Sequence, residues 1–156
     1  MENRLHIVNI EGAVYRDDRY LVVRRGSGES HAPGTLSLVG GGIDTRDESS
    51  DDVILATLRR EIVEEVGVQV RDITYVTGWT FRLDDGQDVI NLLFLCAYDS
   101  GIATPADPNE VEEVHWMRAD DIITHPDAPS WTRDAIRKCE ALRAALSGAS
   151  GQAGQA

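Results

Sequence analysis

The sequence predicts a single domain of the α/β class, with helices packed on a sheet. Segments rich in β-branched and aromatic residues recur along most of the chain, and one central segment has the apolar spacing of a helix. The 156 residues suffice for one hydrophobic core that folds unaided. We place the domain at residues 1–146 and expect the tail, residues 147–156, to be disordered because it contains only Gly, Ala, Ser and Gln.

The segments expected to form strands are 7–15, 20–25, 35–39, 68–83, 88–98 and 111–117. A polar turn separates the first two, and Asp84-Asp85-Gly86-Gln87 separates the two longest. Each of these pairs is therefore expected to form an antiparallel hairpin. The short strand at 35–39 leads into three consecutive glycines, Gly40 to Gly42.

A central helix is predicted to begin at Asp52 or Val53 and to end at Gly67, which is a strong stop signal. Its apolar face is marked by residues three and four positions apart, namely Leu55, Leu58, Ile62 and Val66. A short helical piece is expected at 119–124, and a final helix is expected to follow the segment 126–130.

Composition narrows the function classes. The net charge is −12, from 27 acidic and 15 basic residues, which argues against a nucleic-acid partner because backbone binding requires a basic surface. No apolar run approaches the ~20 residues of a membrane helix, so no membrane partner is expected. Cys96 and Cys139 give no disulfide framework, and the N-terminal residues lack a signal-peptide pattern, so the expected localisation is cytoplasmic. The sequence leaves the oligomeric state open, a homodimer included.

Three glutamates of the central helix are the first candidates for chemistry: Glu61, Glu64 and Glu65. Residues three and four positions apart on a helix are neighbours, so these carboxylates repel one another unless a cation lies among them. Their oxygens are hard ligands that suit Mg²⁺ or Mn²⁺. Arg60 precedes Glu64 by four residues and can orient its carboxylate by a charged hydrogen bond. A Glu-Glu pair alone more often lies on a solvated helix face. The neighbouring sequence must therefore decide between a solvated face and a metal site.

The segment from Arg60 to Val68 resembles the second half of the box of the Nudix hydrolases, a family that includes MutT-like enzymes. That half runs Arg-Glu, an aliphatic residue, any residue, Glu-Glu, any residue, Gly and an aliphatic residue, and the segment matches every fixed position. The resemblance extends over about residues 7–146, because the predicted elements follow the family's order. It implies a Nudix-type α/β/α sandwich, in which the box helix and a C-terminal helix pack on a mixed sheet.

The first half of the box departs from the family pattern. Gly42 and Glu48 keep the expected gap of five residues, but eleven residues instead of seven separate Glu48 from Arg60. We interpret the difference as a four-residue insertion in the loop before the helix, where extra length costs little. Either Glu48 or Asp52 is expected to support this loop.

The resemblance implies a pyrophosphohydrolase that uses Mg²⁺ or Mn²⁺ to cleave a diphosphate linkage by attack of water on phosphorus. The implied metal ligands are Glu61, Glu64 and Glu65. The implied catalytic residues are Glu61, Glu64, Arg60 and Glu110. The general base is either Glu61 or a later loop glutamate. Glu110 is preferred among the loop residues for its place in a Pro/Asn-containing segment, with Glu112 and Glu113 as alternatives.

Residues predicted to bind the substrate are Gly41, Gly42, Arg24, Arg25 and Phe81. Glycines let a phosphate or a metal approach the backbone closely, although a flexible turn is the alternative. The two arginines end a strand and can hold a terminal phosphate, or they form a surface pair. Phe81 lies in the long hairpin with Trp79 and Arg82, where a base can stack or an aromatic side chain can join the core. The histidines, His31 among them, show no metal-ligand spacing and are interpreted as incidental.

Two missing motifs bear on the substrate. The chain lacks the Ser-Gln-Pro-Trp type motif of NADH pyrophosphatases, and Asp84 stands where ADP-ribose enzymes often have a proline, about sixteen residues past the box. We therefore expect a small-molecule nucleotide substrate, with a nucleoside triphosphate as the first choice. The alternatives are hydrolysis of ADP-ribose or nucleotide sugars, and a non-catalytic domain that senses a nucleotide. The three retained glutamates favour catalysis.

Overall fold

The computed structural model describes residues 4–152 of the chain. Within those residues it contains one seven-stranded sheet and three helices. In chain order the elements are β1 (His6–Arg16), β2 (Arg19–Arg25), β3 (Leu36–Ser37), β4 (Val39–Gly42), α1 (Val53–Val66), β5 (Val68–Arg82), β6 (Asp88–Gly101), β7 (Val111–Arg118), α2 (Ala119–Thr124) and α3 (Ser130–Gln152).

The sheet is mixed. Its strand order is β3-β2-β1-β6-β5, while β4 pairs with β1 and β7 pairs with β2. β1 and β6 run parallel in a continuous register from His6 opposite Asp88 to Tyr15 opposite Ala97. The other strand pairs are antiparallel, and they include both predicted hairpins, β1 with β2 and β5 with β6.

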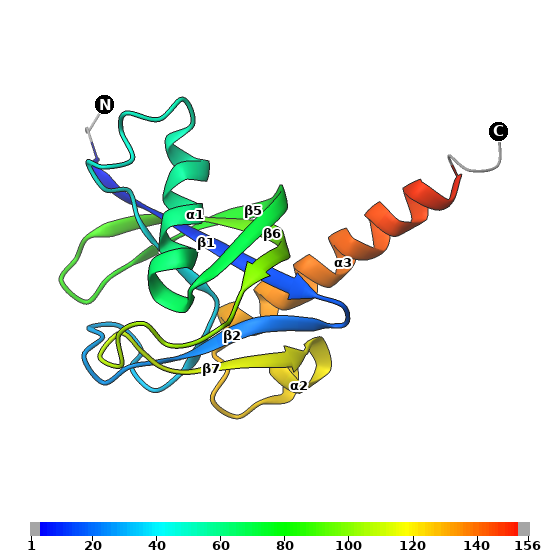
Figure 1. The fold of residues 1–156 in the computed structure, drawn as a ribbon. Coiled ribbons are helices and arrows are strands. Elements are labelled where there is room, and N and C mark those ends of the chain that lie inside the picture. Colours follow the sequence, from blue (N-terminus) through cyan, green and yellow to red (C-terminus); the bar gives the residue numbers. More distant parts are fainter. Residues whose placement is uncertain (1–3, 153–156) are drawn as a thin grey trace.

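The helices lie on both sides of the sheet, which gives three layers (Figure 1). On one face, Leu58 and Ile62 of α1 pack with Ile10 of β1. On the other face, Ile136 of α3 packs with Ala13 of β1. Successive side chains of a strand point to opposite faces, so even-numbered β1 residues face α1 and odd-numbered ones face α3. The predicted α/β/α sandwich is confirmed.

α1 begins and ends where the sequence predicts. The Asp52 carboxylate accepts a hydrogen bond from the Leu55 backbone N–H at 3.0 Å and caps the helix. Gly67 ends the helix in the left-handed conformation, with φ at 71°. Of the two residues considered as supports of the preceding loop, Asp52 is therefore the helix cap, while Glu48 is exposed.

Two segments differ from the prediction. Gly40 to Gly42, for which the sequence predicted no strand, belong to β4 and pair with β1. α3 continues to Gln152, so residues 147–152 are helical where disorder was expected, and residues 153–156 lie outside the described part of the chain. α3 extends beyond the sheet as an exposed arm (Figure 1).

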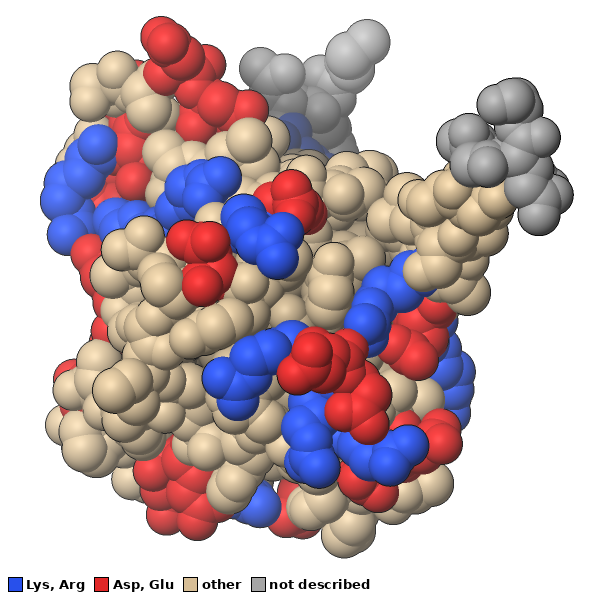
Figure 2. Space-filling view, turned by 45° about the vertical axis from the view of Figure 1, so that its right-hand side comes forward, with Lys and Arg blue, Asp and Glu red and all other residues tan. Residues whose placement is uncertain are grey.

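Charged side chains of both signs lie on the surface (Figure 2). On the face shown in Figure 2, Lys and Arg side chains are interspersed with Asp and Glu side chains. None of the helices within residues 4–152 is long and apolar enough to span a membrane.

Candidate functional site

A cavity of about 280 Å³ lies between α1, the glycine strand β4 and the loop that precedes β7. We call it the acidic cavity because four glutamates line it: Glu29, Glu61, Glu65 and Glu110. Five of the residues that the sequence predicted for the site converge here, namely Glu61, Glu65, Glu110, Arg25 and Gly41. Segments far apart in the sequence therefore form one site.

Glu61 and Glu65 reach this cavity because they lie about one helical turn apart on the side of α1 that packs against β4. Gly41 permits the close approach, since a Cβ atom at this position would overlap the Glu61 carboxylate. Gly42 is outside the cavity lining, and its carbonyl oxygen accepts a hydrogen bond from Arg60 Nη2 at 3.1 Å. The two predicted glycines thus have different neighbours.

The surroundings of the two helix carboxylates disfavour their charged forms. Burial raises the pKa of Glu65 to about 8, and the charge of Glu61 adds to the effect, while a hydrogen bond from the Gly40 backbone N–H opposes it. Burial also raises the pKa of Glu61, against the opposing effect of its ion pair with Arg60. An added cation would stabilise both ionised carboxylates. This oxygen donor set therefore fits a hard divalent cation such as Mg²⁺ or Mn²⁺.

Glu110 enters the cavity from the loop before β7. Its backbone carbonyl oxygen accepts from the Gly26 N–H at 2.8 Å, and its own N–H donates to the Asp107 carbonyl oxygen at 3.1 Å. These two hydrogen bonds fix the loop against the segment that follows β2. The alternatives from the same region lie elsewhere: Glu112 is exposed, and the Glu113 carboxylate accepts from Arg24 and contacts His115.

Arg24 and Arg25 have different surroundings, because adjacent strand side chains point to opposite sides. Arg25 lines the acidic cavity, pairs with Glu29 and donates from Nε to the His31 carbonyl oxygen at 2.8 Å. Arg24 donates instead to the Asp127 carboxylate at 3.0 Å. Of the predicted pair, the fold brings only Arg25 to the cavity.

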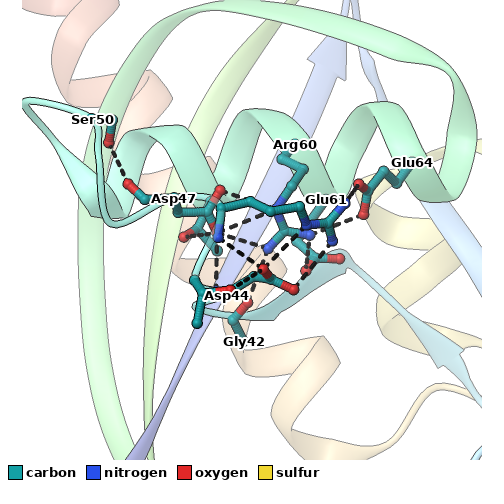
Figure 3. Close-up of polar contacts among 10 residues, drawn as sticks. Gly42, Asp44, Asp47, Ser50, Arg60, Glu61 and Glu64 are labelled. Carbon is teal, nitrogen blue, oxygen red and sulfur yellow. Dashed lines mark hydrogen bonds and ion pairs between the residues drawn. The ribbon is translucent and has the colours of Figure 1, made fainter.

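A second group of charges lies on the flank of α1 (Figure 3). We call it the Arg60 cluster, and its members are Asp44, Arg46, Asp47, Arg60 and Glu64. Arg60 donates to the Asp47 carboxylate at 2.9 Å, to Glu61 at 2.7 Å and to Glu64 at 2.9 Å. The predicted hydrogen bond from Arg60 to Glu64 is thus present, within a larger network than the sequence indicated.

Asp47 is the support of the insertion loop, and sequence reasoning missed it. Its side chain is 4% exposed, accepts from the Thr57 hydroxyl at 2.9 Å and receives two nitrogens of Arg60. The Arg60 guanidinium holds the pKa of the Asp47 carboxyl well below its usual range. Counting box positions led to Glu48 and Asp52, and the four-residue insertion is what makes that count unreliable.

The predicted metal triad is divided between these two regions. Glu61 and Glu65 line the acidic cavity, whereas the Glu64 carboxylate accepts from Arg60 and from Arg46, the latter at 3.0 Å. Within residues 4–152, no three His, Cys, Asp or Glu side chains form a ready-made metal-binding group. The physical reason is that the arginines of the cluster hold Glu64 toward the insertion loop.

A second cavity, of about 350 Å³, adjoins the first. We call it the aromatic cavity because its lining includes His31, Trp79, Phe81 and Trp131. The His31 ring lies between two of the others, with its centroid 5.9 Å from that of Phe81 and 5.8 Å from that of Trp131. The predicted residue Phe81 is thus in place, and Trp79 also packs against the core.

His31 and Trp131 were missed as lining residues. Each is a single residue in its own segment, fifty or more positions from Phe81, and nothing in the local sequence links the three. The polar residue Glu11 within an apolar strand is another lining residue that the sequence did not single out. Glu11 lies in the same strand phase as the core residue Ala13, and a charged residue in that phase was the signal that the sequence offered.

Comparison with known proteins identifies the family of this chain. A model of the NUDIX domain matches residues 6–139. The chain is 28% identical over 135 residues to proteins named NAD-capped RNA hydrolase NudC from Escherichia coli O1:K1 / APEC and from Enterobacter sp. (strain 638). The match covers 83% of this chain and 47% of each relative, so the chain spans about half the length of these curated relatives.

The fold is similar to solved structures. The crystal structure of the MutT NUDIX hydrolase from Burkholderia pseudomallei has a TM-score of 0.73 at 23% identity, covering 86% of this chain and 98% of that one. The MutT protein from Methanosarcina mazei Go1 has a TM-score of 0.73 at 19% identity, covering 92% and 99%. The chain therefore belongs to the NUDIX domain family.

Proposed function

We propose that this Nudix hydrolase cleaves the diphosphate linkage of a nucleotide, with a nucleoside triphosphate as the first candidate substrate and Mg²⁺ or Mn²⁺ as the cofactor. The observation that carries the proposal is the junction of the two cavities, which share Asn9, Arg25, Leu38 and Gly40. The acidic cavity suits a diphosphate accompanied by a cation, and the aromatic cavity suits a planar base.

Glu61 and Glu65 are the proposed metal ligands inside the acidic cavity. Glu64 is proposed as the third, because one nitrogen of Arg60 contacts both Glu61 and Glu64 and the two carboxylates therefore lie close together. When bound, a divalent cation neutralises charge on the diphosphate and lowers the pKa of an attacking water. Glu64→Gln tests the third ligand: a loss of turnover as large as that of Glu65→Gln supports it, and a much smaller loss limits Glu64 to pairing with Arg60.

The remaining roles belong to side chains at the junction. Arg25 is proposed to hold a phosphate, since it lines both cavities and its Nε is fixed by the His31 carbonyl oxygen. Glu110 is proposed to take a proton from the attacking water, with Glu61 as the alternative base. Arg60 is proposed as a positioning residue, because its guanidinium is fully engaged with carboxylates and with the Gly42 carbonyl oxygen.

A dinucleotide linked by a diphosphate, such as NAD, is a second candidate substrate. The names of the curated relatives favour it, although the sequence lacks the motif of NADH pyrophosphatases. The aromatic cavity is compatible with either class, since each contains a planar ring attached to a diphosphate through a ribose. ADP-ribose and nucleotide sugars share that chemistry and belong in the same test.

The test is product analysis with a panel of nucleoside triphosphates, NAD, NADH, ADP-ribose and nucleotide sugars, each with Mg²⁺, with Mn²⁺ and with chelator. Metal-dependent release of a nucleoside monophosphate together with pyrophosphate, or with a second phosphate-bearing fragment, is the expected result. The highest kcat/KM identifies the substrate class. Tight binding of one member without turnover would instead favour the non-catalytic sensor.

Glu112→Gln is the matched control for the glutamate variants. Glu112 is exposed and lies two residues from Glu110 on the same segment. The control should keep the wild-type rate, so that a loss in the cavity variants reports the position of the carboxylate and not the loss of one charge from an acidic protein.

A further inference from the structure

A chain of three polar side chains lies on the wall of the aromatic cavity, and its first member, Asn9, also lines the acidic cavity. The parallel register of β1 and β6 places Asn9 opposite Asn91, and Glu11 follows two residues later on the same face. Asn9 Nδ2 donates to Asn91 Oδ1 at 2.6 Å, and Asn91 Nδ2 donates to Glu11 Oε2 at 2.9 Å. All three residues line the cavity.

This polar chain stands where the strand pattern calls for apolar side chains. Asn91 is 2% exposed, and its neighbours in the same phase of β1 and β6, Ala13 and Leu93, belong to the core on the α3 side. Burial raises the pKa of Glu11, while the hydrogen bond from Asn91 and the charge of Arg25 oppose the shift. A carboxyl kept at such a position costs folding free energy, and the proposed hydrolytic steps do not use it.

The carboxylate sets the direction of every hydrogen bond in the chain. Because Asn91 Nδ2 donates to Glu11 Oε2, Asn91 presents its Oδ1 to Asn9. Asn9 then donates with Nδ2. Within residues 4–152, the side chain that hydrogen-bonds Glu11 is Asn91, through Oε2. Glu11 Oε1 and Asn9 Oδ1 are therefore the acceptors that remain for a ligand, and the polar wall presents acceptors to a ring.

We propose that Glu11, held by Asn91, is a specificity-determining residue of the aromatic cavity. Its carboxylate accepts a hydrogen bond from an exocyclic amino group of a nucleotide base whose faces lie among Trp79, Phe81 and Trp131. Bases that carry such an amino group are selected over counterparts that lack it. The inference rests on the proposed function only in taking the ring to be that of a nucleotide, and it names the class of ring that the site accepts.

The test measures binding without turnover, by calorimetric titration of nucleoside monophosphates, which have no diphosphate linkage to cleave. The probes are two matched pairs: GMP with IMP, and AMP with purine riboside 5′-monophosphate. Each pair differs by one exocyclic amino group. Wild-type protein should bind the aminated member of at least one pair about 10- to 100-fold more tightly, the range expected for one hydrogen bond to a charged group.

Glu11→Gln should remove or reverse this preference. Asn91 Nδ2 would keep the new amide oxygen, so the amide NH₂ would point into the cavity and replace an acceptor by a donor. Glu112→Gln, an exposed change of the same chemistry, should keep the wild-type preference. Thermal unfolding checks that Glu11→Gln is folded, and Glu11→Asp, which keeps the charge but shortens the reach, should weaken the preference if the first variant is unstable.

Three results would overturn the proposal: equal binding of both members of both pairs by wild type, no binding of any probe at millimolar concentration, or an unchanged preference in the folded Glu11 variants. The substrate panel keeps this test separate from the proposed function. A Glu11-dependent preference without turnover would support the role of Glu11 and count against hydrolysis. Turnover together with a base preference that the Glu11 variants leave unchanged would support hydrolysis and count against the role of Glu11.

Discussion

The two flanks of α1 hold carboxylates in opposite electrostatic states. In the Arg60 cluster, hydrogen bonds from arginines lower the pKa of Asp47 and bring that of Asp44 to about 2. In the acidic cavity, burial raises the pKa of Glu65 to about 8 and also raises that of Glu61. The residue types are alike, and the difference lies in burial: in the cavity, desolvation outweighs the ion pair of Glu61 with Arg60, whereas in the cluster the hydrogen bonds from Arg60 outweigh the desolvation of Asp47.

This contrast separates carboxylates whose charge the arginines of the chain offset from carboxylates whose charge burial disfavours. The cluster is neutralised by Arg46 and Arg60, so it can fix the insertion loop on α1 without any ligand. The acidic cavity holds more carboxylates than cationic side chains, since Arg25 is the only Lys or Arg among its lining residues. An external cation would complete it.

Glu65→Gln should lower turnover by several orders of magnitude and make the metal-free protein more stable. In the folded state the pKa of Glu65 is raised from 4.5 to about 8. Ionisation of Glu65 is therefore costly for the folded protein, and the free energy of unfolding falls as the pH rises through that interval. A neutral isostere removes this cost, and the free energy of unfolding at pH 8 should rise by roughly 4 kcal/mol. Near-normal turnover, or a less stable variant, would contradict the account.

Glu110→Gln should lower kcat by about 100-fold with little change in KM, as expected for the loss of a general base. Steady-state kinetics with the best substrate of the panel provides the measurement, and Glu112→Gln is its control. A silent Glu110→Gln would transfer the role of base to Glu61.

Arg25→Lys should raise KM about tenfold, because an ammonium cannot reproduce the two-pronged hydrogen bonding of a guanidinium to phosphate. Arg24→Lys is the matched variant, one residue earlier on the same strand, and should leave KM unchanged. If the two variants had equal effects on KM, phosphate binding would not distinguish the two sides of β2.

Asp47→Asn should affect stability more than chemistry. The pKa of Asp47 is depressed by Arg60, so its ionised form contributes stability at neutral pH, and that contribution is lost as the pH falls below about 4. The variant should melt earlier than wild type at pH 7, and the gap should narrow as the pH falls below about 4. A gap that widened in acid would contradict the assigned pKa direction.

The sequence predicted what depends on local spacing. The limits of α1, the turn-to-turn approach of Glu61 and Glu65, and the hydrogen bond from Arg60 to Glu64 all follow from helix geometry over a few residues. The reach of Glu110 was also indicated by its loop.

The sequence did not predict what depends on long-range placement. Because of the insertion, counting box positions did not identify Asp47. The contacts of His31 with Phe81 and Trp131 depend on how three distant segments pack. The choice of Arg25 over Arg24 depends on strand phase, which requires knowing which face of β2 meets the cavity.

Binding of Mn²⁺ to wild type, Glu65→Gln and Asp47→Asn, measured by calorimetry at pH 7.5, distinguishes a cation site in the acidic cavity from one in the Arg60 cluster. Wild type and Asp47→Asn should bind the ion and release protons as they do so, because the carboxyls of the acidic cavity must ionise. Glu65→Gln should lose most of that affinity. If Glu65→Gln bound Mn²⁺ as wild type does while Asp47→Asn did not, the cation site would lie in the Arg60 cluster, and the division between the two flanks of α1 would be wrong.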